Sequence, residues 1–241
     1  LLEAHQGPNP ILLGRPRAGK TALAHEIARR IVVGDVVGEL RDMRIYEMTP
    51  ASILAGLQFG EGWRSHISSL FAFLHENGPV LLFLRDLHMA VGAGVRRGDD
   101  SDDDLASALE ASLRGTSIKI IAESRPDRWQ QIAAEREGLA DLFVSVELKQ
   151  PSDEDLRQIL EHGAESVTER TGIPVTEAAK AAVIDIARRF ILNQAFPGKA
   201  IELLEDALIA TQRSGARRID APQVISCFRN RTGLTEMLLD D

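Results

Sequence analysis

The residues best suited to chemistry in this chain lie in one short stretch, GRPRAGKT at positions 14–21. Its spacing matches the pattern G-x-x-x-x-G-K-[ST]. The two glycines allow a tight loop whose backbone N–H groups point at phosphate oxygens. Lys20 adds a mobile cation for the outer phosphates, and the Thr21 hydroxyl can ligate Mg²⁺. The stretch therefore predicts a phosphate-binding loop.

The segments on either side of this loop have the pattern needed to position it. An apolar run at 10–13 leads in, and apolar residues recur at helical spacing over 20–33. The helix presents the positive end of its dipole to the same anion. A glycine turn between a strand and a helix is the alternative, but the Lys-Thr pair favours nucleotide. The expected nucleotide contacts in the loop are Gly14, Arg17, Ala18, Gly19, Lys20 and Thr21.

Further along the chain, short apolar segments alternate with helical patterns. The remaining expected strands are 44–48, 80–84, 118–122 and 143–146, and the expected helices between them include 63–74 and 105–113. Such alternation predicts an α/β fold whose five-stranded parallel sheet is covered on both faces.

From Pro151 onward the periodicity is helical only, and Ser152 with Asp155 forms a capping box. We therefore expect a large α/β nucleotide-binding domain at 1–149 and a small all-α domain at 150–230. Residues 231–241 are expected to form a linker towards a following module.

Composition limits the possible functions. The 241 residues are 27% charged and 44% hydrophobic, which is typical of a globular protein, and the net charge is −8. An acidic chain offers no overall basic field to attract nucleic acid. A single cysteine, Cys227, excludes a disulfide within the chain, and no apolar run approaches the ~20 residues of a membrane span. These features favour a cytoplasmic setting with no membrane contact.

The phosphate loop, the alternating strands and the helical tail together resemble the AAA+ superfamily. The chain is most similar to the first ATPase module of two-ring Clp-type unfoldases, through motifs that cover nearly its whole length. These motifs are NPILLG at 9–14, ILAG at 53–56, LFL at 82–84, GAG at 92–94, FPGKAI at 196–201 and RTGL at 231–234.

The resemblance implies a strand order of 5-1-4-3-2, with ATP or ADP bound between the two domains. It also implies self-association into a ring, a hexamer in the family, and a protein substrate that passes through the pore. The aromatic pore residue of the family corresponds to Phe59, for which packing in the core is the alternative.

Two groups of catalytic residues depart from the family pattern. The family ends its third strand in Asp-Glu, an acid for Mg²⁺ and an acid for the attacking water, where this chain has Arg85 and Asp86. Arginine has no acceptor atom and stays protonated, so Arg85 cannot ligate a cation. The family's arginine fingers correspond to Asp141 and Leu142. A finger can supply ~10³–10⁵ in rate in other phosphoryl-transfer systems.

The family's sensor residues are retained in type. Ser124 corresponds to the polar sensor after the fourth strand, and Lys199 to the basic sensor at the start of a helix in the small domain. An exposed lysine at a helix start is the alternative for Lys199. Arg85 is a further candidate for contact with the nucleotide, or for a pair with Asp86 that fills the pocket.

The sequence therefore predicts a Clp-like AAA+ module that binds ATP or ADP and hydrolyses ATP weakly or not at all. Its need for Mg²⁺ through Thr21 is doubtful, because one metal-binding carboxylate is missing. Two alternatives stay open: an active ATPase that uses Asp86 as its catalytic acid, and a nucleotide-free scaffold for oligomerisation or partner binding. A nucleic-acid motor such as a clamp loader is disfavoured by the acidic composition.

Overall fold

We describe a computed structural model of the chain, which covers residue 2 and residues 8–55, 63–94, 104–114, 116 and 118–233. Phe59, most of the acidic run at 99–104 and most of the expected linker at 231–241 lie outside these residues. The chain divides into two compact units: residues up to Gly14 with Lys20–Leu148, and Arg15–Gly19 with residues from Lys149 onward.

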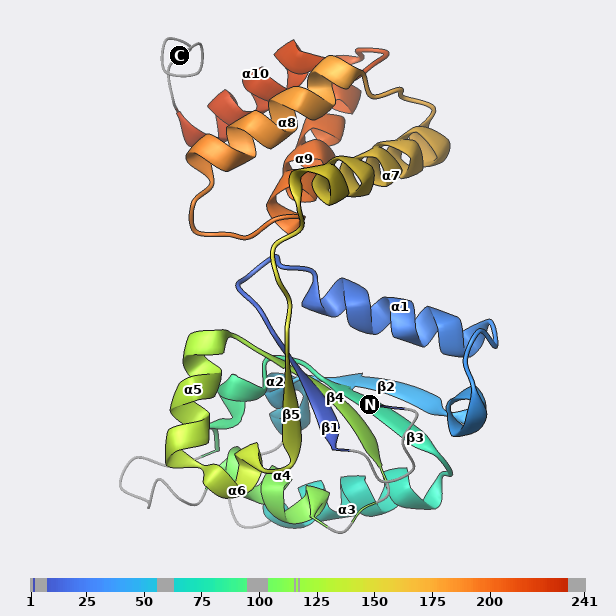
Figure 1. Cartoon of the computed structure of the whole chain (residues 1–241), viewed down its shortest axis with the longest axis vertical. Coiled ribbons are helices and arrows are strands. Elements are labelled where there is room, and N and C mark those ends of the chain that lie inside the picture. Colours follow the sequence, from blue (N-terminus) through green and yellow to red (C-terminus); the bar gives the residue numbers. More distant parts are fainter. Residues whose placement is uncertain are drawn as a thin grey trace. The chain divides into compact units, whose positions relative to one another are not determined.

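The first unit is built on a five-stranded parallel sheet with the order β2-β3-β4-β1-β5 (Figure 1). This is the order that the resemblance implied. The strands are β1 Asn9–Leu13, β2 Arg44–Met48, β3 Val80–Leu84, β4 Lys119–Ser124 and β5 Phe143–Glu147. All five residues of β3 are buried, as expected for a central strand that is covered on both faces.

Helices cover both faces of this sheet (Figure 1). One face packs against α1, Lys20–Val32, through Leu12, Leu81 and Ile121. The helices on the other face are α2 Pro50–Leu54, α3 Trp63–Glu76, α4 Leu105–Leu113, α5 Pro126–Glu135 and α6 Glu137–Ala140. Two short 3-10 turns, η1 Gly38–Asp42 and η2 Leu87–Ala90, complete the described part of this unit.

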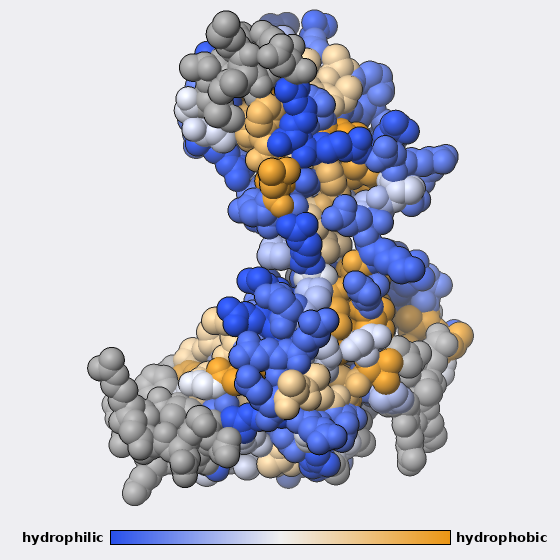
Figure 2. Space-filling model, turned by 60° about the vertical axis from the view of Figure 1, so that its left-hand side comes forward, coloured by the Kyte–Doolittle hydropathy of each residue, from blue (hydrophilic) through white to orange (hydrophobic). Residues whose placement is uncertain are grey.

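The second unit is an all-α bundle with its own core. Its helices are α7 Asp153–Thr171, α8 Glu177–Phe190, α9 Gly198–Ser214 and α10 Ala221–Thr232. The predicted capping box is present at the start of α7, where the Ser152 side chain accepts from the Asp155 amide. Hydrophilic side chains cover most of these helices in the view of Figure 2. Cys227 is only half-buried beside the core.

Candidate nucleotide-binding site

The phosphate loop joins β1 to α1 and contains two left-handed residues. Arg17 has a φ of 70° and Gly19 a φ of 98°. Alternation of left- and right-handed residues turns successive N–H groups to the same side, the arrangement from which anion-binding nests are built. The Gly14 amide donates to the Ser124 carbonyl at 3.4 Å, which ties the start of the loop to the carboxyl end of β4.

The first turn of α1 supplies the two polar side chains of the motif. Lys20 Nζ donates to the Gly14 carbonyl at 2.9 Å, so its side chain folds back over the loop. Burial lowers the pKa of the Lys20 ammonium, and the carboxylates of Glu123 and Asp86 oppose that shift. Thr21 Oγ1 donates to Glu123 Oε2 at 3.1 Å.

Three charged side chains gather on the α1 face of the sheet, where strands β2, β3 and β4 end. Side chains alternate between the two faces of a strand. Leu81 and Phe83 pack on the α1 side, and Arg85 continues that alternation beyond β3. Glu47 and Glu123 reach the same face from the neighbouring strands, and both are hydrogen-bonded to Arg85.

These groups form one hydrogen-bonded chain. Arg85 Nη1 donates to Glu47 Oε1 at 2.8 Å, and Arg85 Nε lies 3.4 Å from Glu123 Oε1. His25 Nε2 on α1 lies 2.8 Å from the other oxygen of Glu47. The alternative of an Arg85–Asp86 pair is wrong, because the guanidinium joins carboxylates of the adjacent strands instead.

The pKa values of the two carboxylates shift in opposite directions. Hydrogen bonds from His25 and Arg85 hold the pKa of Glu47 below its ordinary value. Burial raises the pKa of Glu123, and the contacts with Thr21, Lys20 and Arg85 partly offset that rise. The side chain of Glu123 is only 4% exposed, against 36% for Arg85. The acid is therefore the more deeply buried member of this ion pair.

Asp86 follows directly after Arg85 but leaves the strand geometry. Its backbone is left-handed, with a φ of 49°, and it lies directly before the η2 turn. A left-handed aspartate is uncommon, and such positions concentrate at functional sites. The next residue is Leu87, whose fully buried aliphatic side chain supplies no second acid. Asp86 stays a candidate acid that acts on Lys20 and Glu123 through its charge.

The donor set of this site fits a divalent metal ion poorly. Thr21 and Glu123 are ligand types that Mg²⁺ accepts beside phosphate oxygens. However, the guanidinium of Arg85 lies against the same carboxylate, so a cation bound there would face a fixed positive charge. Among the residues that the structure describes, His, Cys, Asp and Glu side chains form no group of three or more that could hold a metal.

The remaining expected residues of the first unit lie elsewhere on this framework. Ser124 is buried, and its hydroxyl lies 3.4 Å from the carbonyl oxygen of the next residue. The Thr21 hydroxyl is hydrogen-bonded to Glu123, the residue before Ser124 in β4, and not to Ser124. Asp141 is exposed and Leu142 partly exposed, just before β5. Neither side chain carries the positive charge of an arginine finger.

In the second unit, residues of the loop contact the start of α9 and the segment before it. Arg15 Nη2 donates to the Leu192 carbonyl at 2.9 Å, and Arg17 forms an ion pair with Glu202 at 3.1 Å. The Gly198 amide donates to the Arg17 carbonyl at 2.9 Å. The two loop arginines therefore have protein partners.

Lys199 lies in the first turn of α9 and is only 6% exposed, so the expectation of an exposed helix-start lysine is wrong. Its Nζ donates to the Ile191 carbonyl at 2.8 Å and lies 4.1 Å from the centre of the Phe196 ring. Burial lowers the pKa of this ammonium. A buried cation with these partners has a defined position, which a sensor residue requires.

Sequence reasoning missed Glu47 and Glu123. Both lie at the carboxyl ends of expected strands, and ligand sites in open α/β sheets form at that edge. Glu123 directly follows the apolar run 118–122, and that position was the available signal. The pairing of β4 with β3 is needed to show that this acid meets Arg85.

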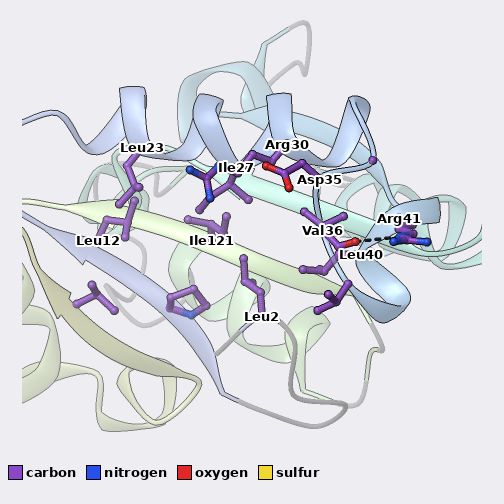
Figure 3. Close-up of a pocket in the computed structure, with 14 residues that line it drawn as sticks. Leu2, Leu12, Leu23, Ile27, Arg30, Asp35, Val36, Leu40, Arg41 and Ile121 are labelled. Atoms are coloured by element: carbon purple, nitrogen blue, oxygen red, sulfur yellow. Dashed lines mark hydrogen bonds between the residues drawn. The ribbon is translucent and has the colours of Figure 1, made fainter.

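A second, apolar pocket lies on the α1 face of the sheet, with a volume of about 670 Å³. Leu23 and Ile27 point from α1 towards Leu12 and Ile121 of the sheet (Figure 3). Lys20, Thr21, Arg85 and Glu123 are not among its lining residues. The lining is mostly apolar, although it also includes Arg30 and Arg41, and the residues of the phosphate loop take no part in it.

Fold and site together define a phosphate-loop α/β module followed by a helical bundle. Residues 10–144 match the family model "ATPase family associated with various cellular activities (AAA)", so the chain belongs to this family. Every helix among the described residues is too short or too polar to cross a bilayer.

The relatives are chaperones. The chain is 30% identical over 200 residues to chaperone protein ClpB 1 of Synechocystis sp., covering 83% of this chain and 22% of that protein. It is 28% identical over 231 residues to ClpB of Rhodopirellula baltica, covering 95% of this chain and 26% of the relative. The chain thus spans about a quarter of the length of these relatives, and it is a Clp-type AAA+ module.

Solved structures share the fold. The Hsp104–ADP complex of S. cerevisiae superimposes with a TM-score of 0.79 at 23% identity, covering 97% of this chain and 40% of that one. A closed state of Hsp104 with ATPγS and FITC casein gives a TM-score of 0.73 at 22% identity, covering 94% of this chain and 40% of that one.

Proposed function

We propose that this chain is a nucleotide-binding AAA+ module of a Clp-like protein unfoldase, in which ATP hydrolysis is weak or absent. The observation that carries the proposal is Arg85 at the end of β3, held between Glu47 and Glu123. These side chains lie on the face of the sheet that packs against α1, the helix of Thr21. The resemblance expects an Mg²⁺-binding acid at this position. The phosphate loop, with Lys20 and two left-handed residues, keeps the features that bind ATP or ADP.

The assembly part of the proposal rests on the relatives. One Hsp104 structure contains ADP, and another contains ATPγS and casein. By analogy, we expect this module to form a ring, to bind ATP or ADP with little dependence on Mg²⁺, and to contact a protein substrate through Phe59. Asp141 and Leu142 cannot act as arginine fingers, so work on the substrate would come from another module.

Titration calorimetry with ADP and ATPγS tests nucleotide binding. We expect the wild type to bind both, and Lys20→Ala to weaken binding at least about tenfold, because it removes the ammonium that faces the outer phosphates. Lys149→Ala is the matched control, since Lys149 is exposed beyond β5. Absence of binding in the wild type would contradict the proposal and favour the scaffold.

Phosphate release with Mg²⁺-ATP, at protein concentrations where rings form, tests hydrolysis separately. We expect release by the wild type at the background level of Lys20→Ala. Robust turnover that is lost in both Lys20→Ala and Asp86→Asn would establish the alternative, an ATPase that uses Asp86 as its acid. Turnover that is lost in Lys20→Ala but kept in Asp86→Asn would also refute weak hydrolysis. It would indicate a catalytic acid other than Asp86.

A further inference from the structure

Glu123 is an acid of this site that contacts the first turn of the phosphate-loop helix. Its Oε2 accepts from Thr21 Oγ1 at 3.1 Å, and its Oε1 lies 3.4 Å from Arg85 Nε. Each carboxylate oxygen therefore has its own partner. Thr21 is the residue whose hydroxyl would ligate a metal beside a bound phosphate. The carboxylate thus lies within hydrogen-bonding distance of the hydroxyl that such a metal would need.

The charge of Glu123 requires compensation. A carboxylate that is 4% exposed is strongly disfavoured without a nearby cation. Arg85 supplies a cation that stays protonated, and Glu47 on β2 holds the other side of the same guanidinium at 2.8 Å. Lys20 is the second positive group that acts on Glu123. Arg85 is therefore fixed between two acids from neighbouring strands.

We infer that the Arg85 guanidinium takes the place of a divalent cation in this module, and that Glu123 is a latent metal ligand which Arg85 keeps closed. The inference rests on the proposed nucleotide binding. It goes further because it assigns a metal-binding acid to Glu123 on β4, in place of the acid that is missing at position 85. It also predicts that one substitution opens a metal site. Removal of Arg85 leaves Thr21 and Glu123 together without the opposing guanidinium, a donor pair that Mg²⁺ accepts beside phosphate oxygens.

The test compares nucleotide affinity in excess MgCl₂ with affinity in excess EDTA, by calorimetry with ADP. The wild type should give a ratio of dissociation constants close to one. Arg85→Gln should bind at least about tenfold more tightly in MgCl₂ than in EDTA. The double variant Arg85→Gln/Glu123→Gln should return to a ratio close to one, because it lacks the carboxylate that the metal requires.

Arg170→Gln is the matched control, since it removes a guanidinium from a 2.8 Å ion pair with Glu205 in the second unit. Its ratio should stay close to one. A wild type whose affinity collapses in EDTA would overturn the inference. Arg85→Gln with a ratio close to one, or a double variant that keeps the metal dependence, would also overturn it.

A second measurement judges the Arg85–Glu123 contact without nucleotide, so it separates failure of this inference from failure of nucleotide binding. Urea unfolding of the wild type, Arg85→Gln, Glu123→Gln and the double variant forms a double-mutant cycle. We expect the two substitutions to couple by about threefold or more in the unfolding equilibrium constant. Additive effects would refute the bridge, whether or not the protein binds ADP.

Discussion

Asp104 illustrates how one buried charge is accommodated in the first unit. Its side chain is fully buried, and Arg136 Nη2 donates to it at 3.1 Å. The amides of Gly92 and Ser107 also donate to the carboxylate, so Asp104 caps α4 as well. Arg136, which lies near the expected finger position, therefore pairs within its own unit. Asp104 thus ends the acidic run at 99–104 by forming the N-cap of α4.

At the residue scale, we predict that Asp104→Ala lowers the free energy of unfolding by about 3 kcal/mol, because it removes a fully buried carboxylate that pairs with the half-buried guanidinium of Arg136. Urea unfolding followed by circular dichroism measures the change. Asp127→Ala is the control, since Asp127 forms an exposed pair with Arg125 and should change stability far less. Equal effects of the two substitutions would contradict the prediction.

At the element scale, the start of α10 depends on a side-chain cap. Asp220 accepts from the Ala221 amide and from Thr176 Oγ1, and the Asp220 amide donates to Gln223 in return. The hydrogen bond from Thr176, with that of the Ala221 amide, lowers the pKa of Asp220 below its ordinary value of 3.8. The ionised cap therefore joins α8 to α10.

This lowered pKa predicts an acid-dependent contribution to stability. A carboxyl with a lower pKa in the folded state stabilises above its unfolded pKa, and that contribution is lost as the pH falls through the folded value. Stability should therefore fall as the pH decreases below about 4, and less in Asp220→Asn, which caps without titrating. Urea unfolding at several pH values measures this. The same pH dependence in both proteins would contradict the assignment.

The junction of the phosphate loop with α9 gives a second element-scale prediction. A Cβ on Gly198 would lie 2.5 Å from the Arg17 carbonyl oxygen, a backbone atom that cannot move alone. We expect Gly198→Ala to displace the loop, lowering both stability and nucleotide affinity. In the control Gly163→Ala, the new Cβ would meet only the end of the Ile201 side chain, so this variant should stay near the wild type. Differential scanning calorimetry and ADP titration measure both effects.

At the scale of the whole molecule, each unit has a hydrophobic core of its own. The cores of the first unit pack on the two faces of the sheet, and that of the second lies among α7–α10. We predict that a fragment of residues 150–233 keeps its helical circular dichroism and unfolds cooperatively in urea. A gradual, non-cooperative transition would contradict the independence of the proposed small domain.

The sequence alone determined the phosphate loop, the strand at 80–84 and the change to helical periodicity after Pro151. These features depend on neighbours along the chain: glycine positions, a short apolar run and the spacing of apolar residues. The loss of an acid at Arg85 was likewise visible, because this residue directly follows a recognisable strand. The family resemblance then supplied the strand order, which the structure confirms.

Only the tertiary structure decided which acids meet Arg85. Thr21 and Glu123 are 102 residues apart, and Arg85 and Glu123 are 38 apart. Their contacts depend on β4 pairing between β1 and β3, and on which face of each strand holds the side chain. A shift of one residue in register would turn Glu123 away from α1 and bring Ser124 there instead. Sheet pairing therefore determined the partner of the phosphate loop, and local sequence could not.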